Sequence, residues 1–175
     1  MSQPGLKGPL LERPGGSAPR RFDLAPMAKG LQRMTVIYAL LSVALMFWRD
    51  QPVAKAAGAF MTGIALFIYG YFRPSHFEVS PEALTLVWLV RRRVIPRASI
   101  LKAETLGTRD LGWMLRIGAG GVGGAFGSFY TSKRGFIDGY FTCMDGLVLL
   151  SLEGRRPLLL SPADPVAFQS ALGLG

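Results

Sequence analysis

Two apolar segments, 34–48 and 53–72, follow each other with only a short polar loop between them. The second segment has Lys55 near its start as its only charge, and about 20 apolar helical residues cross the ~30 Å hydrocarbon core of a bilayer. The first segment is shorter, so its helix must begin earlier and Arg33 must extend to the lipid headgroups. Aromatic residues, which favour the membrane interface, lie near the ends of both segments. We predict a transmembrane helical hairpin over residues 31–72.

Two alternatives explain the same segments. In a soluble protein they would form a buried helical hairpin, but so short a chain has little other mass to cover two helices that are apolar on all sides. In a secreted protein they would belong to a signal peptide with an apolar core at 35–47 and cleavage near Ala54-Lys55-Ala56. A long tail before that core and a second apolar segment after it argue against cleavage. The membrane hairpin is the preferred interpretation.

The chain has 20 Lys and Arg against 11 Asp and Glu, with a formal net charge of +9. The basic residues that precede the first segment or follow the second include Lys7, Arg13, Arg20, Arg21, Lys29, Arg33, Arg73, Arg91, Arg92 and Arg93. Positive-inside bias therefore predicts a two-pass protein of a cell inner (plasma) membrane with both termini in the cytoplasm. The basic and aromatic pattern of a nucleic-acid-binding face is missing. Cys143 is the only cysteine, which excludes an intramolecular disulfide and agrees with a cytoplasmic domain.

The composition divides the chain into three parts. Residues 1–30 are basic and rich in proline and glycine, which predicts a disordered tail. Residues 31–72 form the predicted hairpin. Residues 73–175 leave room for one small folded domain of roughly 100 residues.

After residue 73 the apolar pattern changes from helical to strand-like. The strands we expect cover residues 77–79, 84–90, 94–95, 136–143, 147–152 and 157–160. Arg91-Arg92-Arg93 predicts a turn, and Asp145-Gly146 and Glu153-Gly154 are typical of hairpin turns. Ser161 followed by Pro162 predicts the start of a C-terminal helix. The expected fold is α+β, with an antiparallel β-barrel or sandwich capped by that helix.

Several stretches of the domain occur in a characteristic order. They are residues 77–81 with 84–86, 94–100, 115–118 with the glycines to Gly127, and 160–168. With the preceding hairpin, these stretches make residues 76–172 resemble the bacterial pleckstrin-homology (PH) domain family, in which the domain is attached to a short transmembrane hairpin. The resemblance implies two roughly orthogonal sheets capped by a helix, and it makes homo-oligomers plausible. It implies a fold more than a function.

The sequence contains no recognisable constellation for catalysis, a metal or a cofactor. Residues 118–123 match G-x-G-x-x-G, but glycines and aromatics follow where a nucleotide site needs a helix, so a close backbone approach is the simpler interpretation. His76 is the only histidine and has no clustered ligands or nucleophile motif around it. Asp138 and Asp145 are ordinary solvated carboxylates. We therefore expect a protein that is not an enzyme.

One charge cluster has a geometric argument. If a strand leaves the membrane after residue 72 and the next one returns, Arg91, Arg92 and Arg93 come back to headgroup depth, with Arg97 close by. Each could gain about 1 kcal/mol from an anionic leaflet. The alternative is a solvated hairpin tip. The first turn, residues 80–83, contains an acid and no base, which argues against a stereospecific phosphoinositide pocket.

These observations lead to two functional hypotheses. The first is a membrane-anchored, non-enzymatic interaction or scaffold module that presents a strand edge or the open end of its barrel to a protein partner. The alternative is sensing of anionic lipid headgroups through the basic cluster, with Lys133 and Arg134 as further candidates. The small-residue motif Ala59-x-x-x-Gly63 suggests a face for self-association or for packing against the first span.

Overall fold

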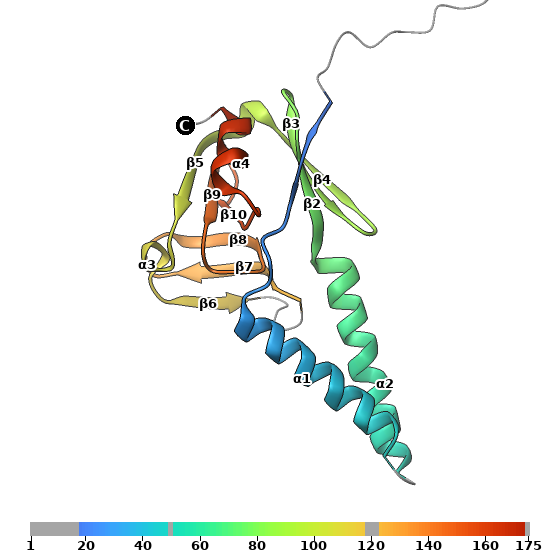
Figure 1. The fold of residues 1–175 in the computed structure, drawn as a ribbon. Helices are drawn as coiled ribbons and strands as arrows, with labels where there is room; N and C mark the ends of the chain where they lie inside the picture. Colours follow the sequence, from blue (N-terminus) through green and yellow to red (C-terminus); the bar gives the residue numbers. More distant parts are fainter. Residues whose placement is uncertain (1–17, 49–50, 118–122, 174–175) are drawn as a thin grey trace, which may run out of the picture.

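A computed structural model describes residues 18–48, 51–117 and 123–173 of the chain. It contains a pair of helices, two β-sheets and a short C-terminal helix, so the fold class is α+β as predicted (Figure 1). The elements in chain order are β1 (Arg20–Asp23), α1 (Lys29–Met46), α2 (Pro52–Phe67), the π-helix η1 (Ile68–Phe72), β2 (Pro74–Val79), β3 (Ala83–Trp88), β4 (Arg92–Pro96), the 3₁₀ turn η2 (Arg97–Ser99), β5 (Ile100–Leu106), α3 (Thr108–Leu111), β6 (Met114–Ile117), β7 (Ala125–Thr131), β8 (Gly135–Phe141), β9 (Leu147–Leu152), β10 (Leu158–Leu160) and α4 (Pro165–Leu172).

The strands form a four-stranded sheet in the order β1-β2-β3-β4 and a six-stranded sheet in the order β5-β9-β10-β8-β7-β6. The expected purely antiparallel arrangement is wrong in one place, because β10 pairs with β8 in parallel. Since β10 lies between β8 and β9, Asp145-Gly146 connects two strands that are not neighbours and does not form the predicted hairpin. Glu153-Gly154 does join the antiparallel neighbours β9 and β10.

The core of the domain lies between the sheets and α4. Phe168 on α4 is fully buried, and its ring packs edge-on against Phe22 of β1 and Phe77 of β2, with centroid separations of 5.3 and 5.9 Å. A second apolar cluster around Phe129 and Leu111 fills the side of the six-stranded sheet that α3 covers. The helix that caps the fold is thus held by aromatic contacts to the first sheet.

The start of α4 differs from the prediction. Asp164, not Ser161, is its N-cap, and the Asp164 carboxylate accepts a hydrogen bond from the Ala167 amide at 2.9 Å. Ser161 is buried, and its hydroxyl accepts a hydrogen bond from the Thr142 amide at 2.9 Å. Both Ser161-Pro162 and Asp164-Pro165 fit the start of a helix. Ser161 is not the N-cap because its hydroxyl is needed as the hydrogen-bond acceptor of the buried Thr142 amide.

The tail prediction needs correction over its second half, while residues 1–17 lie outside the described residues. Residues 20–23 form β1, which pairs with β2 so that Phe22 lies opposite Phe77. The chain then continues beside the C-terminal part of the domain, where the Ala25 amide donates to the Ser161 carbonyl at 2.8 Å. Phe22 is the one apolar residue of β1, so the sequence of β1 shows no alternating pattern that would predict a strand. Only the pairing with β2 identifies it.

The two long helices pack against each other near the loop that joins them and diverge toward the domain (Figure 1). The close contact is at Gly58, where a Cβ would lie 2.6 Å from the Ser42 carbonyl oxygen. Gly58 and Ser42 are the buried residues of α2 and α1 within the described chain. Gly63, by contrast, has no atom near the place of a Cβ, so the predicted small-residue motif does not form the contact with α1.

Within the described residues, one helical stretch is long and apolar enough to cross a membrane. It is Pro52–Phe72, with 21 residues; its apolar stretch of 18 residues has a mean hydropathy of 1.5, and only 6% of that stretch is buried. That exposure argues against the alternative of a core hairpin covered by the rest of this chain. The first turns of α1 contain Lys29, Gln32 and Arg33, which shortens its apolar part. That α1 also crosses the membrane therefore stays a prediction.

Candidate functional site

The tip of the β3–β4 hairpin is apolar, not basic. The strands pair Val87 with Arg92, and the Trp88 amide donates to the Arg91 carbonyl at 2.9 Å, which leaves Leu89 and Val90 as the turn. These two side chains are 78% and 66% exposed. The predicted turn at Arg91-Arg92-Arg93 is therefore wrong by two residues, because the register of the strands sets the turn.

Arg91 connects this hairpin to the end of the long apolar helix. Its guanidinium carbon lies 4.5 Å from the ring centroid of Tyr71 on η1 and 4.5 Å from that of Trp88 on β3. The Trp88 indole N–H also donates to the Phe72 carbonyl at 2.9 Å. A cation between two aromatic faces is stabilised by the ring quadrupoles. Arg91 is thus engaged inside the protein, and its buried Nε has no hydrogen-bond partner among the described residues.

The other predicted lipid-binding residues are dispersed. Arg93 lies 3.9 Å from the Asp138 carboxylate of β8, whereas Arg92 is exposed. Arg97 follows the far end of β4 and donates to the Ala171 carbonyl of α4 at 3.3 Å. The structure therefore does not bring Arg97 together with the other three arginines.

The further candidates Lys133 and Arg134 lie in the β7–β8 turn, away from the β3–β4 hairpin. Lys133 donates to the Arg109 carbonyl at 2.8 Å, and Arg134 forms an ion pair with Glu104 at 3.2 Å. Glu104 also accepts a hydrogen bond from Lys102, and this bond together with the two positive charges lowers the pKa of its carboxyl. This cluster is a surface ion-pair network of the β-sheet.

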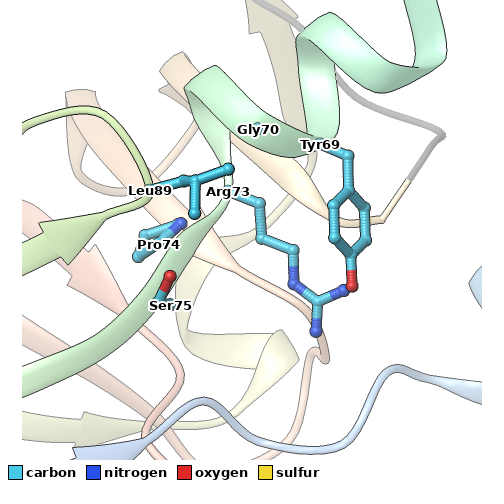
Figure 2. Close-up of a pocket in the computed structure, with 6 residues that line it drawn as sticks. All are labelled: Tyr69, Gly70, Arg73, Pro74, Ser75 and Leu89. Atoms are coloured by element: carbon cyan, nitrogen blue, oxygen red, sulfur yellow. The ribbon is translucent and has the colours of Figure 1, made fainter.

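A pocket of about 210 Å³ lies where the apolar helix enters the domain, and we call it the juxtamembrane pocket (Figure 2). It is lined by Tyr69, Gly70, Arg73, Pro74, Ser75 and Leu89. These residues come from η1, from the start of β2 and from the β3–β4 tip. The Arg73 guanidinium carbon lies 4.7 Å from the Tyr69 ring centroid, and Figure 2 shows the Arg73 side chain extending toward that ring.

The local sequence explains why the pocket forms here. Proline lacks an amide hydrogen and disfavours helical backbone in the residue before it, so Pro74 ends the helix. Arg73 accordingly has extended backbone angles, φ −79° and ψ 119°. The last turn is a π-helix over residues 68–72, a wider turn that is frequent at functional sites. The change from helix to strand at Arg73 lets its side chain lie beside the helix that precedes it.

Residues 75–173 match the family model for the bacterial PH domain. The chain belongs to this bacterial PH domain family. No curated protein and no solved structure matches the chain. The resemblance that the sequence motifs suggested is confirmed for the domain.

Arg73, two residues before the matched PH domain, forms no ion pair with an acidic group in the part of the chain that the structure describes. Within the described residues, the ion pairs involve other groups, namely Arg21–Asp23, His76–Glu78, Arg93–Asp138, Lys102–Glu104 and Arg134–Glu104. His76 is paired with Glu78 at 3.0 Å, and no group of three or more potential metal ligands occurs in the described parts of the chain. The juxtamembrane pocket thus combines an unpaired cation with two hydroxyl groups and apolar walls.

The connection between β6 and β7 reaches the same region. Most of the predicted G-x-G-x-x-G motif, residues 118–122, lies outside the described residues. Its last glycine, Gly123, has φ +76°, and its amide donates to the Thr35 hydroxyl of α1 at 3.2 Å. A Cβ at this position would lie 2.9 Å from the Tyr69 ring. Gly123 therefore makes a close backbone approach between the two helices.

Sequence reasoning did not predict the juxtamembrane pocket. A usable signal was present in the run from Tyr69 to Arg73, where aromatic residues and a cation directly follow an apolar helix. Aromatic and basic residues at that place mark the headgroup region of a membrane. In the sequence this signal indicates topology, and only the tertiary structure brings Leu89 against these residues.

Proposed function

We propose that this protein is a membrane-anchored, non-enzymatic interaction module whose PH domain is held at the cytoplasmic face of a bacterial inner membrane. The observation that carries the proposal is the direct passage from the exposed apolar stretch Pro52–Phe72 into β2 through a single residue, Arg73. Without a linker, the domain lies at the membrane surface whenever this helix crosses the bilayer. Arg91, between Tyr71 and Trp88, further restricts the domain against the helix.

The distribution of side chains on the hairpin supports membrane insertion. The large apolar residues of both helices, such as Leu40 and Phe60, point away from the helix contact and are exposed. In water this surface would cost about 25 cal/mol for each Å² of apolar area, and lipid tails remove that cost. Lys29, Arg33 and Arg73 all lie at the domain end of the helices, in agreement with the positive-inside rule.

We further propose that α1 is the second span. Its residues from Met34 to Met46 are apolar for the most part, and its charged first turn lies beside the domain, where Arg33 can extend to the headgroups. Two spans return the chain to its starting side and leave both termini in the cytoplasm.

The PH domain offers an edge strand for a protein partner. β6 is the last strand of the six-stranded sheet, and Trp113, Leu115 and Ile117 on or beside it are exposed apolar residues. Exposed strand edges bind extended peptides through main-chain hydrogen bonds. The alternative function, headgroup sensing by Arg91, Arg92 and Arg93, has less support because Arg91 and Arg93 have partners within the protein.

The test is membrane extraction and topology mapping of the full chain. Cys143→Ser removes the only thiol, and single cysteines are then placed at Gln51 in the helix loop and at Val166 on α4, which is 73% exposed. We expect the protein to resist carbonate extraction. We also expect Gln51→Cys to react with an impermeant thiol reagent in intact cells and Val166→Cys to react only after lysis. Recovery of the chain as a detergent-free soluble monomer would refute the proposal.

A further inference from the structure

We propose that the juxtamembrane pocket binds the phosphate group of a phospholipid from the leaflet in which the helix ends. The inference rests on the proposed membrane anchoring, since only an embedded helix brings the pocket to the lipid. It concerns Arg73, Tyr69 and Ser75, and not the arginines of β4.

The depth of the pocket fits a headgroup. Tyr69 and Gly70 belong to the last turn of the stretch Pro52–Phe72, and Arg73 is the first residue beyond it. Phe67 and Tyr71 stack at this end with a centroid separation of 5.3 Å, as in the aromatic belts at membrane interfaces. When this stretch spans the hydrocarbon, its final turn lies at the level of the lipid phosphates.

The donors in the pocket fit a phosphodiester. A guanidinium group presents five N–H donors in a planar fork, and a ring contact leaves donors free at its edge. No ion pair or hydrogen bond from another described residue uses the Arg73 guanidinium, which is only in contact with the Tyr69 ring. Tyr69 and Ser75 line the same pocket, and each carries a hydroxyl group that can donate to a further phosphate oxygen. Charge-assisted bonds from arginine are the usual means of holding phosphate.

The apolar surroundings favour a lipid over a free phosphate ion. Gly70 lies between the pocket and an adjoining groove of about 320 Å³, which is lined by Leu66, Phe67, Gly70, Tyr71 and Val90. Gly70 lines both spaces and has no side chain, and a Cβ there would lie 3.8 Å from a Leu89 methyl. The phosphate would occupy the first space, and an acyl chain would extend along α2 in the second.

The experiment measures binding of a short-chain phosphatidylglycerol to the full chain in detergent, with inorganic phosphate and glycerol phosphate as soluble comparisons. Arg73→Gln removes the proposed ligand. Arg92→Gln is the matched control, because it removes the same charge from an exposed position near the hairpin tip but outside the pocket. Losing hydrogen bonds from a charged donor should weaken lipid binding about tenfold or more for Arg73→Gln. The control should bind within about twofold of wild type.

A second variant protects the test against misfolding. Gly70→Leu adds a side chain at the residue that the pocket and the groove share and keeps every charge, so it should weaken lipid binding while leaving glycerol phosphate binding unchanged. Equal binding by wild type and Arg73→Gln would overturn the inference, as would equal losses in Arg73→Gln and Arg92→Gln. Binding of inorganic phosphate as tight as that of the lipid would indicate a free-phosphate site instead. Release of the wild-type chain from membranes by carbonate would refute the anchoring itself, and this outcome is distinct from a failure of lipid binding.

Discussion

In the PH domain, Phe77 and Phe168 are fully buried, whereas in the helical hairpin Leu40, Phe60 and Leu66 are 65%, 70% and 69% exposed. The two regions use the same kinds of side chain. The domain buries them against one another, and the hairpin buries chiefly Ser42 and Gly58, which are small.

The difference is the one expected if, as we propose, the hairpin lies in lipid and the domain in water. An apolar surface that faces outward on both helices is stable only where water is absent, while the domain shields its apolar residues with two sheets and a helix. The juxtamembrane pocket lies where the two regions meet, and its residues Arg73 and Tyr69 carry polar groups, unlike the exposed apolar side chains of the hairpin and the buried apolar side chains of the domain. Mutations can test whether truncating a side chain lowers stability in the domain and leaves it unchanged on the outer surface of the hairpin.

The largest expected effect is in the domain core. Phe168→Ala removes the ring that packs on Phe22 and Phe77, and we expect it to destabilise the domain by about 3–5 kcal/mol. Phe60→Ala, which truncates an exposed ring on α2, is the matched control and should leave the domain unchanged. Denaturant unfolding of the full chain in detergent measures both. Similar losses in the two variants would mean that the hairpin is packed like a core.

A smaller effect is expected at the helix contact. Gly58→Leu places a side chain where even a Cβ would lie 2.6 Å from the Ser42 carbonyl oxygen, so it should force α1 and α2 apart at a cost of about 1–3 kcal/mol. Gly63→Leu points into open space and should be tolerated. The distance between spin labels on the two helices reports the separation. Unchanged distances in Gly58→Leu would show that the contact is not the one described.

Next in size is the link between the two regions. Arg91→Met removes the cation between Tyr71 and Trp88 and should destabilise the protein by about 1–2 kcal/mol. Arg92→Gln, at the exposed neighbouring position, should change stability by less than about 0.5 kcal/mol. Thermal unfolding in detergent gives both values. A stabilised Arg91→Met would indicate that burial of its unpartnered Nε costs more than the ring contacts contribute.

The smallest effect concerns pH and is confined to the domain. The pKa of Glu104 is lowered in the folded protein by its bond to Lys102 and by the charges of Lys102 and Arg134. The carboxylate therefore stabilises the fold above its unfolded pKa, and this contribution is lost as the pH falls through the folded pKa. Glu104→Gln should flatten that part of the stability profile, and Glu153→Gln, which is exposed in the β9–β10 turn, should not. Parallel acid limbs in wild type and Glu104→Gln would contradict the prediction.

Much of the local structure was predictable because it depends on neighbouring residues. The apolar segments, the strands β8, β9 and β10 and the turn at Glu153-Gly154 follow from periodicity and turn chemistry. The patterns do not predict β5 or β7. In β5 a register shift between Ile100 and Lys102 breaks the alternation, and in β7 glycine and serine interrupt it.

The candidate site was less predictable because it is made by pairing across the sequence. The basic run suggested a lipid-facing turn, but the pairing of Leu86 with Arg93 moves the turn to Leu89 and Val90. That shift of two residues places Arg91 between two rings and brings Leu89 to the helix end beside Arg73.

The sequence alone determined that this chain has an apolar helical part, a basic flank and a β-rich domain of the bacterial PH family, since length, charge and local period are properties of consecutive residues. Only the tertiary structure decided that β1 joins the first sheet, that β10 enters between β8 and β9, and that Arg73 lies in a pocket beside the Tyr69 ring. Hydrogen bonds between strands join residues that are distant in the chain, and so does the contact of Arg91 with the Tyr71 ring. The pattern of a single segment therefore does not predict them.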